Sequence, residues 1–103
     1  MENEDRLIFT VVIAGRKQKD AILTAMLTAG VHVIHTLYGH GTVKTGYLEN
    51  TLGLIPEHKK VVITALSKRG KSQAILKILH EEFHFNIPNT GIVFTIPVEK
   101  ISF

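Results

Sequence analysis

The stretch LIFTVVIAGRKQKDAILTAMLTAG, residues 7 to 30, combines two patterns that together decide the fold. Residues 7 to 14 form a short apolar, β-branched run, which predicts a strand. After a basic polar turn, residues 17 to 29 carry apolar side chains at the i, i+3, i+4 and i+7 positions of one helix face. Gly30 is a favoured helix terminator. The stretch therefore predicts a strand followed by an amphipathic helix.

The second half of the chain repeats this arrangement. Residues 59 to 66 (KKVVITAL) predict another strand, and residues 71 to 84 carry a second helical apolar stripe. The tripeptide Ala-Ile-Leu at positions 21 to 23 recurs at positions 74 to 76, and the same offset superimposes the first strand on the third. A doubled unit is the simplest explanation.

Strands are also predicted after both helices, at residues 31 to 38 and 91 to 98. The element order is then βαββαβ. With right-handed crossovers, two such units interleave into one antiparallel four-stranded sheet with both helices on one face. We therefore expect residues 1 to 103 to form a single α+β domain, a ferredoxin-like sandwich with a long loop between the second and third strands.

The other face of the predicted sheet has no helix to cover it. Side chains alternate along a strand, and we expect the helix side to carry Phe9, Val11, Ile13, Ile92, Phe94 and Ile96. The opposite face would then carry Ile8, Thr10, Val12, Ile34, Thr36, Val62, Thr64, Leu66, Val93 and Thr95. Because this second set is half aliphatic and uncharged, we expect it to pack against other copies of the chain, which predicts a homo-oligomer.

Composition narrows the class of protein. The 103 residues are 45% hydrophobic and include no cysteine, which excludes disulfides, thiolate metal sites and cysteine nucleophiles. The acidic start and the lack of a long apolar run predict a cytoplasmic protein. A net charge of +3 is too small to argue for nucleic acid as a partner. An RNA-recognition module would also need aromatic residues on the third strand, and residues 61 to 66 have none.

Residues 39 to 58 form a connection far longer than the 2 to 5 residues that a hairpin needs. Several glycines accompany apolar side chains, among them Tyr47, Leu48 and Leu52. One interpretation is a surface loop that packs on its own domain. The interpretation we favour is an element that becomes ordered on a ligand or partner.

A family resemblance emerges from these features. The element order, the long loop, its Gly39-His40-Gly41 entry and the closing segment GIVFTIPVE at residues 91 to 99 together resemble the P-II (PII) nitrogen regulatory protein family. The resemblance implies a cytoplasmic homotrimer that is not an enzyme and has no catalytic cofactor. It also implies clefts between subunits that bind ATP or ADP, often with 2-oxoglutarate, and a loop that docks on a partner enzyme or membrane transporter.

The resemblance also implies site residues. Gly39, His40 and Gly41 correspond to one wall of the nucleotide cleft, Gly91 to a phosphate-loop glycine, and Lys60 to the lysine before the third strand. Backbone amides and a lysine suit a polyphosphate. The partner-docking residues on the loop would be Lys44, Tyr47, Leu48 and Leu52.

The chain departs from the family pattern near the cleft. Asn89 and Thr90 stand where the family has Gly-Asp, and Ile92 replaces its phosphate-binding lysine. Val43 stands where a glutamine helps hold magnesium and 2-oxoglutarate. The resemblance therefore leaves the identity of the effector open.

An alternative function rests on His80-Glu81-Glu82-Phe83-His84, which fits the H-E-x-x-H zincin pattern. In that pattern His80 and His84 hold zinc one helical turn apart, and Glu81 polarises its water. This would make the chain a metal-binding or zinc-dependent hydrolytic protein. The competing interpretation is an ordinary polar helix end.

Two basic groups follow the first and third strands at equivalent turns. We expect them to share one end of the sheet, either as a solvated rim or as a contact for an anion or an acidic partner. They comprise Arg16, Lys17, Lys19, Lys68, Arg69 and Lys71.

Overall fold

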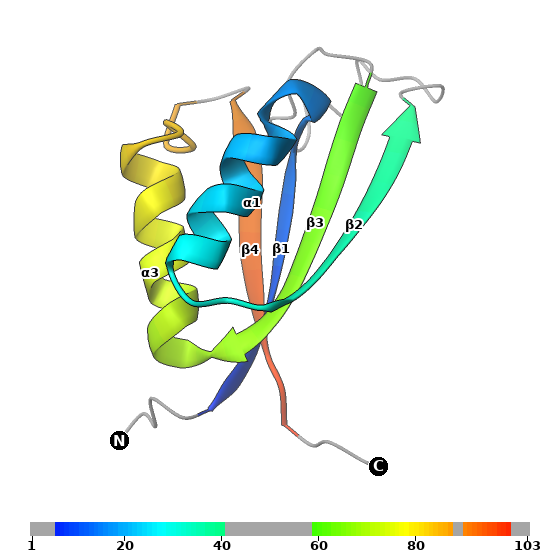
Figure 1. The fold of residues 1–103 in the computed structure, drawn as a ribbon. Coiled ribbons are helices and arrows are strands. Elements are labelled where there is room, and N and C mark those ends of the chain that lie inside the picture. The colour runs from blue at the N-terminus through cyan, green and yellow to red at the C-terminus, as the bar shows by residue number, and fades with distance from the viewer. Residues whose placement is uncertain (1–5, 41–58, 88–89, 100–103) are drawn as a thin grey trace.

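The computed structural model describes residues 6–40, 59–87 and 90–99. Strands and helices alternate along these residues as the sequence predicts (Figure 1). The elements, in chain order, are β1 (Leu7–Gly15), η1 (Arg16–Gln18), α1 (Lys19–Thr28), β2 (Val33–His40), β3 (Lys59–Lys68), α3 (Arg69–Glu81) and β4 (Gly91–Pro97).

The strands form one four-stranded sheet in the order β2-β3-β1-β4, and each neighbouring pair is antiparallel. Both long helices cover the same face of this sheet (Figure 1). The predicted ferredoxin-like α+β architecture is therefore confirmed. Among the described residues, none of the helices has the length and hydropathy needed to cross a lipid bilayer.

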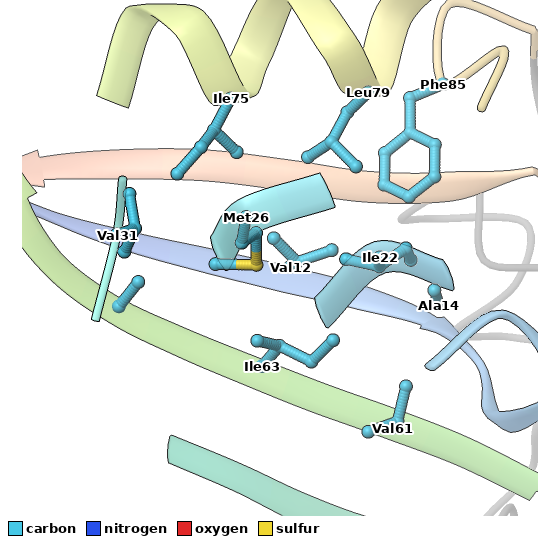
Figure 2. Packing of buried hydrophobic residues seen from close by; sticks show 11 residues of the cluster. Val12, Ala14, Ile22, Met26, Val31, Val61, Ile63, Ile75, Leu79 and Phe85 are labelled. Carbon is cyan, nitrogen blue, oxygen red and sulfur yellow. The ribbon is translucent and has the colours of Figure 1, made fainter. Parts of the chain in front are cut away.

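The core lies between the helices and the sheet, where α1 and α3 press aliphatic side chains onto the two central strands (Figure 2). Each fully buried side chain of this kind contributes roughly 1.5–3 kcal/mol. The most deeply buried members are Val12, Ile22, Met26, Val31, Val61, Ile63, Ile75 and Leu79.

A residue with positive φ follows the end of each long helix. Gly30 (φ +90°) follows α1, and the Val31 amide donates to the Met26 carbonyl at 3.0 Å, while the Gly30 amide donates to Leu27. This is a Schellman termination, which satisfies carbonyls that the helix leaves unpaired. After α3 the corresponding conformation falls on His84 (φ +58°). Three residues of the predicted 71–84 helix therefore lie beyond its end at Glu81.

The predicted faces are wrong for three of the four strands. Val12 and Ala14 lie under the helices, and the register then places Phe9, Val11 and Ile13 on the open face. The same inversion applies to β2 and β4, whereas the prediction for β3 is correct. The physical reason is that both alternating sets on β1 are apolar, so polarity did not distinguish them. Its one polar residue, Thr10, is buried under the helices.

The open face is more apolar than expected. Ladder partners share a face, so the register fixes its members. Lys60 and Lys68 lie at its two ends, and between them only His35 and Thr64 are polar. Four of its side chains are among the most exposed large hydrophobics of the described chain, at 44% to 64%. The central part of the face consists of Phe9, Val11, Ile13, Val33, His35, Leu37, Val62, Thr64, Leu66, Ile92, Phe94 and Ile96.

Candidate functional site

Four of the predicted effector residues lie at one end of the sheet. Gly39 and Lys60 are direct partners in the β2–β3 ladder, and His40 pairs with Lys59 next to them. Gly91 opens β4 and pairs with Ala14, one residue before the end of β1. The register thus brings together residues that are far apart in the sequence. We call this end, defined by Gly39, Lys60 and Gly91, the effector end.

Arg16 ties the effector end together. It follows β1 directly, and its Nη2 donates to the Gly39 carbonyl at 3.2 Å and to the Lys60 carbonyl at 3.5 Å. Its guanidinium carbon lies 4.7 Å from the centroid of the Tyr38 ring, which is within cation–π range. Its Nε is buried and has no hydrogen-bond partner among the described residues. One side chain therefore contacts two consecutive residues of β2 and the β3 residue that pairs with one of them.

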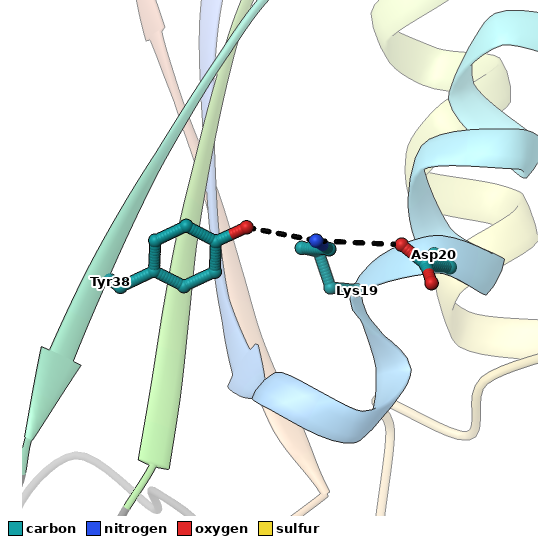
Figure 3. A network of polar contacts seen from close by, with 3 residues as sticks. All are labelled: Lys19, Asp20 and Tyr38. Carbon is teal, nitrogen blue, oxygen red and sulfur yellow. Dashed lines mark hydrogen bonds and ion pairs between the residues drawn. The ribbon is translucent and has the colours of Figure 1, made fainter.

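Lys19 contacts the hydroxyl of Tyr38 (Figure 3). Its Nζ donates to the Tyr38 hydroxyl at 2.8 Å and lies 5.3 Å from the ring centroid. The hydrogen bond to Tyr38 is the main cause that raises the pKa of Lys19 above its ordinary value. Lys19 also lies 3.5 Å from an Asp20 carboxylate oxygen, but Asp20 is 92% exposed and such pairs contribute little. The start of α1 is thus connected to β2 through one aromatic ring.

The basic groups do not share one end of the sheet, contrary to the sequence prediction. In the antiparallel β1–β3 pair, Gly15 faces Lys60 and Leu7 faces Lys68. The turns after these two strands consequently lie at opposite ends. Arg16 and its neighbours join the effector end, whereas Lys68 and the residues that follow it are at the far end.

Arg16 was predicted from the sequence only as part of a basic group that could contact an anion, and Tyr38 was not predicted as a site residue. Their contact depends on strand register, which places the end of β1 beside the start of β3. The available signal was an arginine just after one strand and a tyrosine just before the glycine-rich loop entry at the end of another. Antiparallel pairing of both strands with the same third strand, β3, brings their ends together.

Gly91 has a steric role in the subunit itself. A Cβ atom at this position would come within 2.7 Å of Phe85 Cε1 and 2.8 Å of Cε2, closer than real contacts allow. Phe85 is buried in the core beyond the end of α3. In contrast, a Cβ on Gly39 would meet nothing within 4 Å. A side chain at Gly91 would therefore clash with Phe85, whereas a side chain at Gly39 has room.

The remaining predicted positions are outside the part of the chain that the structure describes. They are Gly41 of the cleft wall and the docking residues Lys44, Tyr47, Leu48 and Leu52. For His40 only the backbone, at the end of β2, is described.

The zincin arrangement is not formed. Because α3 ends at Glu81 and His84 has φ +58°, His80 and His84 do not occupy successive turns of one helix. Residues 6–40, 59–87 and 90–99 contain no group of three or more histidine, aspartate or glutamate residues that would hold a metal ion. The metal-binding or hydrolytic alternative is therefore not favoured.

The sequence matches no protein-family model and no curated protein. Solved structures do resemble it. A Thermus thermophilus protein described as PII-like and signalling matches with a TM-score of 0.67 at 13% identity, over 89% of this chain and 85% of that one. The apo form of CPII from Thiomonas intermedia, a nitrogen regulatory PII-like protein, matches at 0.63 and 16%, over 89% and 90%. The GlnK–ATP complex of B. subtilis matches at 0.64 and 10%, over 94% and 85%.

These similarities span most of the chain at low identity, and so they define its fold. The chain is an α+β protein of the ferredoxin-like class. Within that class it has the fold of PII-like signalling proteins, which confirms at the level of fold the resemblance noted in the sequence.

Proposed function

We propose that this chain is a PII-like regulatory protein rather than an enzyme. In this proposal a cytoplasmic homotrimer binds a small anionic effector, an adenine nucleotide above all, in clefts between subunits. Binding then alters how the loop at residues 39–58 engages a partner enzyme or membrane transporter. The observation that carries the proposal is that Gly39, Lys60 and Gly91 converge at one end of a PII-like fold.

The chemistry of the effector end favours an anion. Arg16, Lys19 and Lys60 supply positive charge there, and Asp20 is a highly exposed counter-charge. Backbone amides near glycines allow close approach of phosphate oxygens. Two of the structurally similar proteins have adenine nucleotides in their structures: GlnK with ATP, and CPII with ADP, AMP and bicarbonate. These ligands are the first to test on this chain.

The open face of the sheet supports the proposed homotrimer. A contiguous apolar surface of this kind marks an interaction site, and its central part contains no lysine, arginine, aspartate or glutamate. Phe94 and Leu37, on opposite edge strands, are 44% and 53% exposed. Self-association through this face would remove these side chains from water.

The test combines solution mass with calorimetry. Light scattering on the eluted protein is expected to give three times the 11.5 kDa chain mass. Isothermal titration with ATP, ADP and AMP, with and without magnesium and 2-oxoglutarate, is expected to give dissociation constants on the order of micromolar for at least one nucleotide. A monomeric mass would contradict the trimer, and no heat from any of the three would contradict the nucleotide effector.

A further inference from the structure

Arg16 contacts the backbone of Gly39 and Lys60 at the effector end. Its Nη2 lies 3.2 Å from the carbonyl oxygen of Gly39 and 3.5 Å from that of Lys60. Gly39 and Lys60 are ladder partners on different strands. A single donor nitrogen thus bridges β2 and β3 at the end of the sheet where they join the 39–58 connection.

The guanidinium is held in place by more than these two bonds. It lies over the ring of Tyr38, and Lys19 anchors the hydroxyl of the same ring at 2.8 Å. An arginine presents its donors in a rigid planar fork that stacks on aromatic rings, whereas a lysine ammonium is a point charge on a flexible stem. The two hydrogen bonds and the stacking on Tyr38 therefore favour arginine over lysine at this position.

The hydrogen bonds also change the electrostatics of the strand ends. Carbonyl oxygens carry partial negative charge and repel an approaching anion. The guanidinium occupies the oxygens of Gly39 and Lys60 and adds a full positive charge beside them.

We propose that Arg16 is a positioning residue of the effector site, bridging the Gly39 and Lys60 carbonyls so that β2 and β3 present one fixed, electropositive end to an anionic ligand. This inference rests on the function proposed above. Tyr38 is the platform that orients the guanidinium, and Lys19 fixes the platform to the start of α1.

The test compares Arg16→Lys and Arg16→Gln with Lys17→Gln, which removes an exposed positive charge from the next position. Titration of each variant with ATP and with ADP is the measurement. We expect Arg16→Lys to weaken nucleotide binding about tenfold or more, because the bridge and the stacking are lost while the charge remains. Lys17→Gln is expected to stay within about threefold of the unmodified chain.

A second pair of variants tests the platform independently. Tyr38→Phe keeps the ring and loses only the Lys19 hydrogen bond, and we expect a change within about threefold. Tyr38→Leu removes the ring and is expected to approach the effect of Arg16→Lys. This pair also keeps the inference testable if Arg16→Gln does not fold.

A spectroscopic readout separates positioning from a general loss of stability. The chain has two tyrosines and no tryptophan, so Tyr47→Phe leaves Tyr38 as the sole tyrosine. In that background, Arg16→Lys is expected to shift the near-ultraviolet absorbance of Tyr38 toward that of a solvated phenol at temperatures where the protein is fully folded. If Arg16 only stabilised the fold, Arg16→Lys would lower the melting temperature and leave the affinity for nucleotide unchanged below that temperature.

The outcomes are distinguishable. If the unmodified chain binds a nucleotide and Arg16→Lys binds it equally well, the positioning role is overturned and the proposed function stands. If the unmodified chain binds none of ATP, ADP and AMP, both are overturned. Weak binding by Arg16→Lys and Tyr38→Leu, with normal binding by Lys17→Gln and Tyr38→Phe, is the expected result.

Discussion

The two faces of the sheet are both apolar, but they are covered differently. On one face α1 and α3 bury Val12, Ile63 and their neighbours completely, together with the polar Thr10 and Ser72. On the other face Phe94 and its neighbours remain partly exposed, although that face carries fewer polar side chains in its central part. The comparison shows that polarity does not determine which side the helices cover. Coverage of the open face by other copies of the chain is part of the function proposed above.

The largest expected effect is on assembly through the open face. Phe94→Asp places a carboxylate on this surface, and burying an unpaired charge costs several kcal/mol. We expect the variant to be monomeric by sedimentation at concentrations where the unmodified chain is a trimer. Leu27→Asp is the control, because Leu27 is similarly exposed (51%) but lies on α1. Dissociation by Leu27→Asp and not by Phe94→Asp would assign the interface to the helices.

The next effect concerns two neighbouring residues of β3 that point to opposite faces. Ile63 is fully buried under the helices, and Ile63→Ala is expected to lower the free energy of unfolding by about 2–5 kcal/mol. Val62 points to the open face, and Val62→Ala is expected to cost less than about 1.5 kcal/mol. Urea unfolding of both variants is the measurement. Equal losses would show that the open face is packed as tightly as the core.

Two glycines of the effector end provide a smaller contrast. Gly91→Ala drives a methyl group into the Phe85 ring and is expected to destabilise the fold by about 1–3 kcal/mol. Gly39→Ala meets no atom and is expected to change stability by less than about 0.5 kcal/mol. Thermal unfolding gives both values. Restoration of stability when Phe85→Leu accompanies Gly91→Ala would confirm the steric cause, and no restoration would contradict it.

The smallest expected effect involves the polar residues of the covered face. Thr10 Oγ1 and Ser72 Oγ are 3.1 Å apart and buried, so Thr10→Val leaves one hydroxyl without its partner. We expect a loss of about 1 kcal/mol in chemical denaturation. Ser67 Oγ is buried without a partner among the described residues, so Ser67→Ala is expected to be neutral or stabilising. A larger loss from Ser67→Ala than from Thr10→Val would reverse this assignment.

Element order and helix positions were predictable because each depends on short-range pattern. Residues 17 to 29 show the helical period directly, and Gly30 marks the end. The faces of β1 were not predictable because Ile8, Val12 and Ala14 are as apolar as the residues between them. Thr10 is on the covered side, where its hydroxyl shares a hydrogen bond with Ser72, 62 positions away. No local pattern contains that information.

The candidate site was predictable only in part. Gly39 and Lys60 were found through a family resemblance, and the register places them as direct partners. The contact between Arg16 and Tyr38 was missed because it requires knowing that β1 ends beside β3. The end of the second helix was misjudged because His84 adopts a left-handed conformation that favours glycine or asparagine.

The register of the sheet has a consequence for the kinetics of folding. In the β2–β3 ladder the pair at the effector end, His40 and Lys59, is separated by 19 positions (59 − 40), whereas Val33 and Leu66 at the far end are separated by 33 (66 − 33). Closing the shorter segment costs about 0.5 kcal/mol less chain entropy. The β1–β3 and β1–β4 ladders have their shortest separations at the same end. Strand pairing is therefore expected to start at the effector end and to proceed away from it, so that the residues proposed to bind ligand are also those from which the sheet grows.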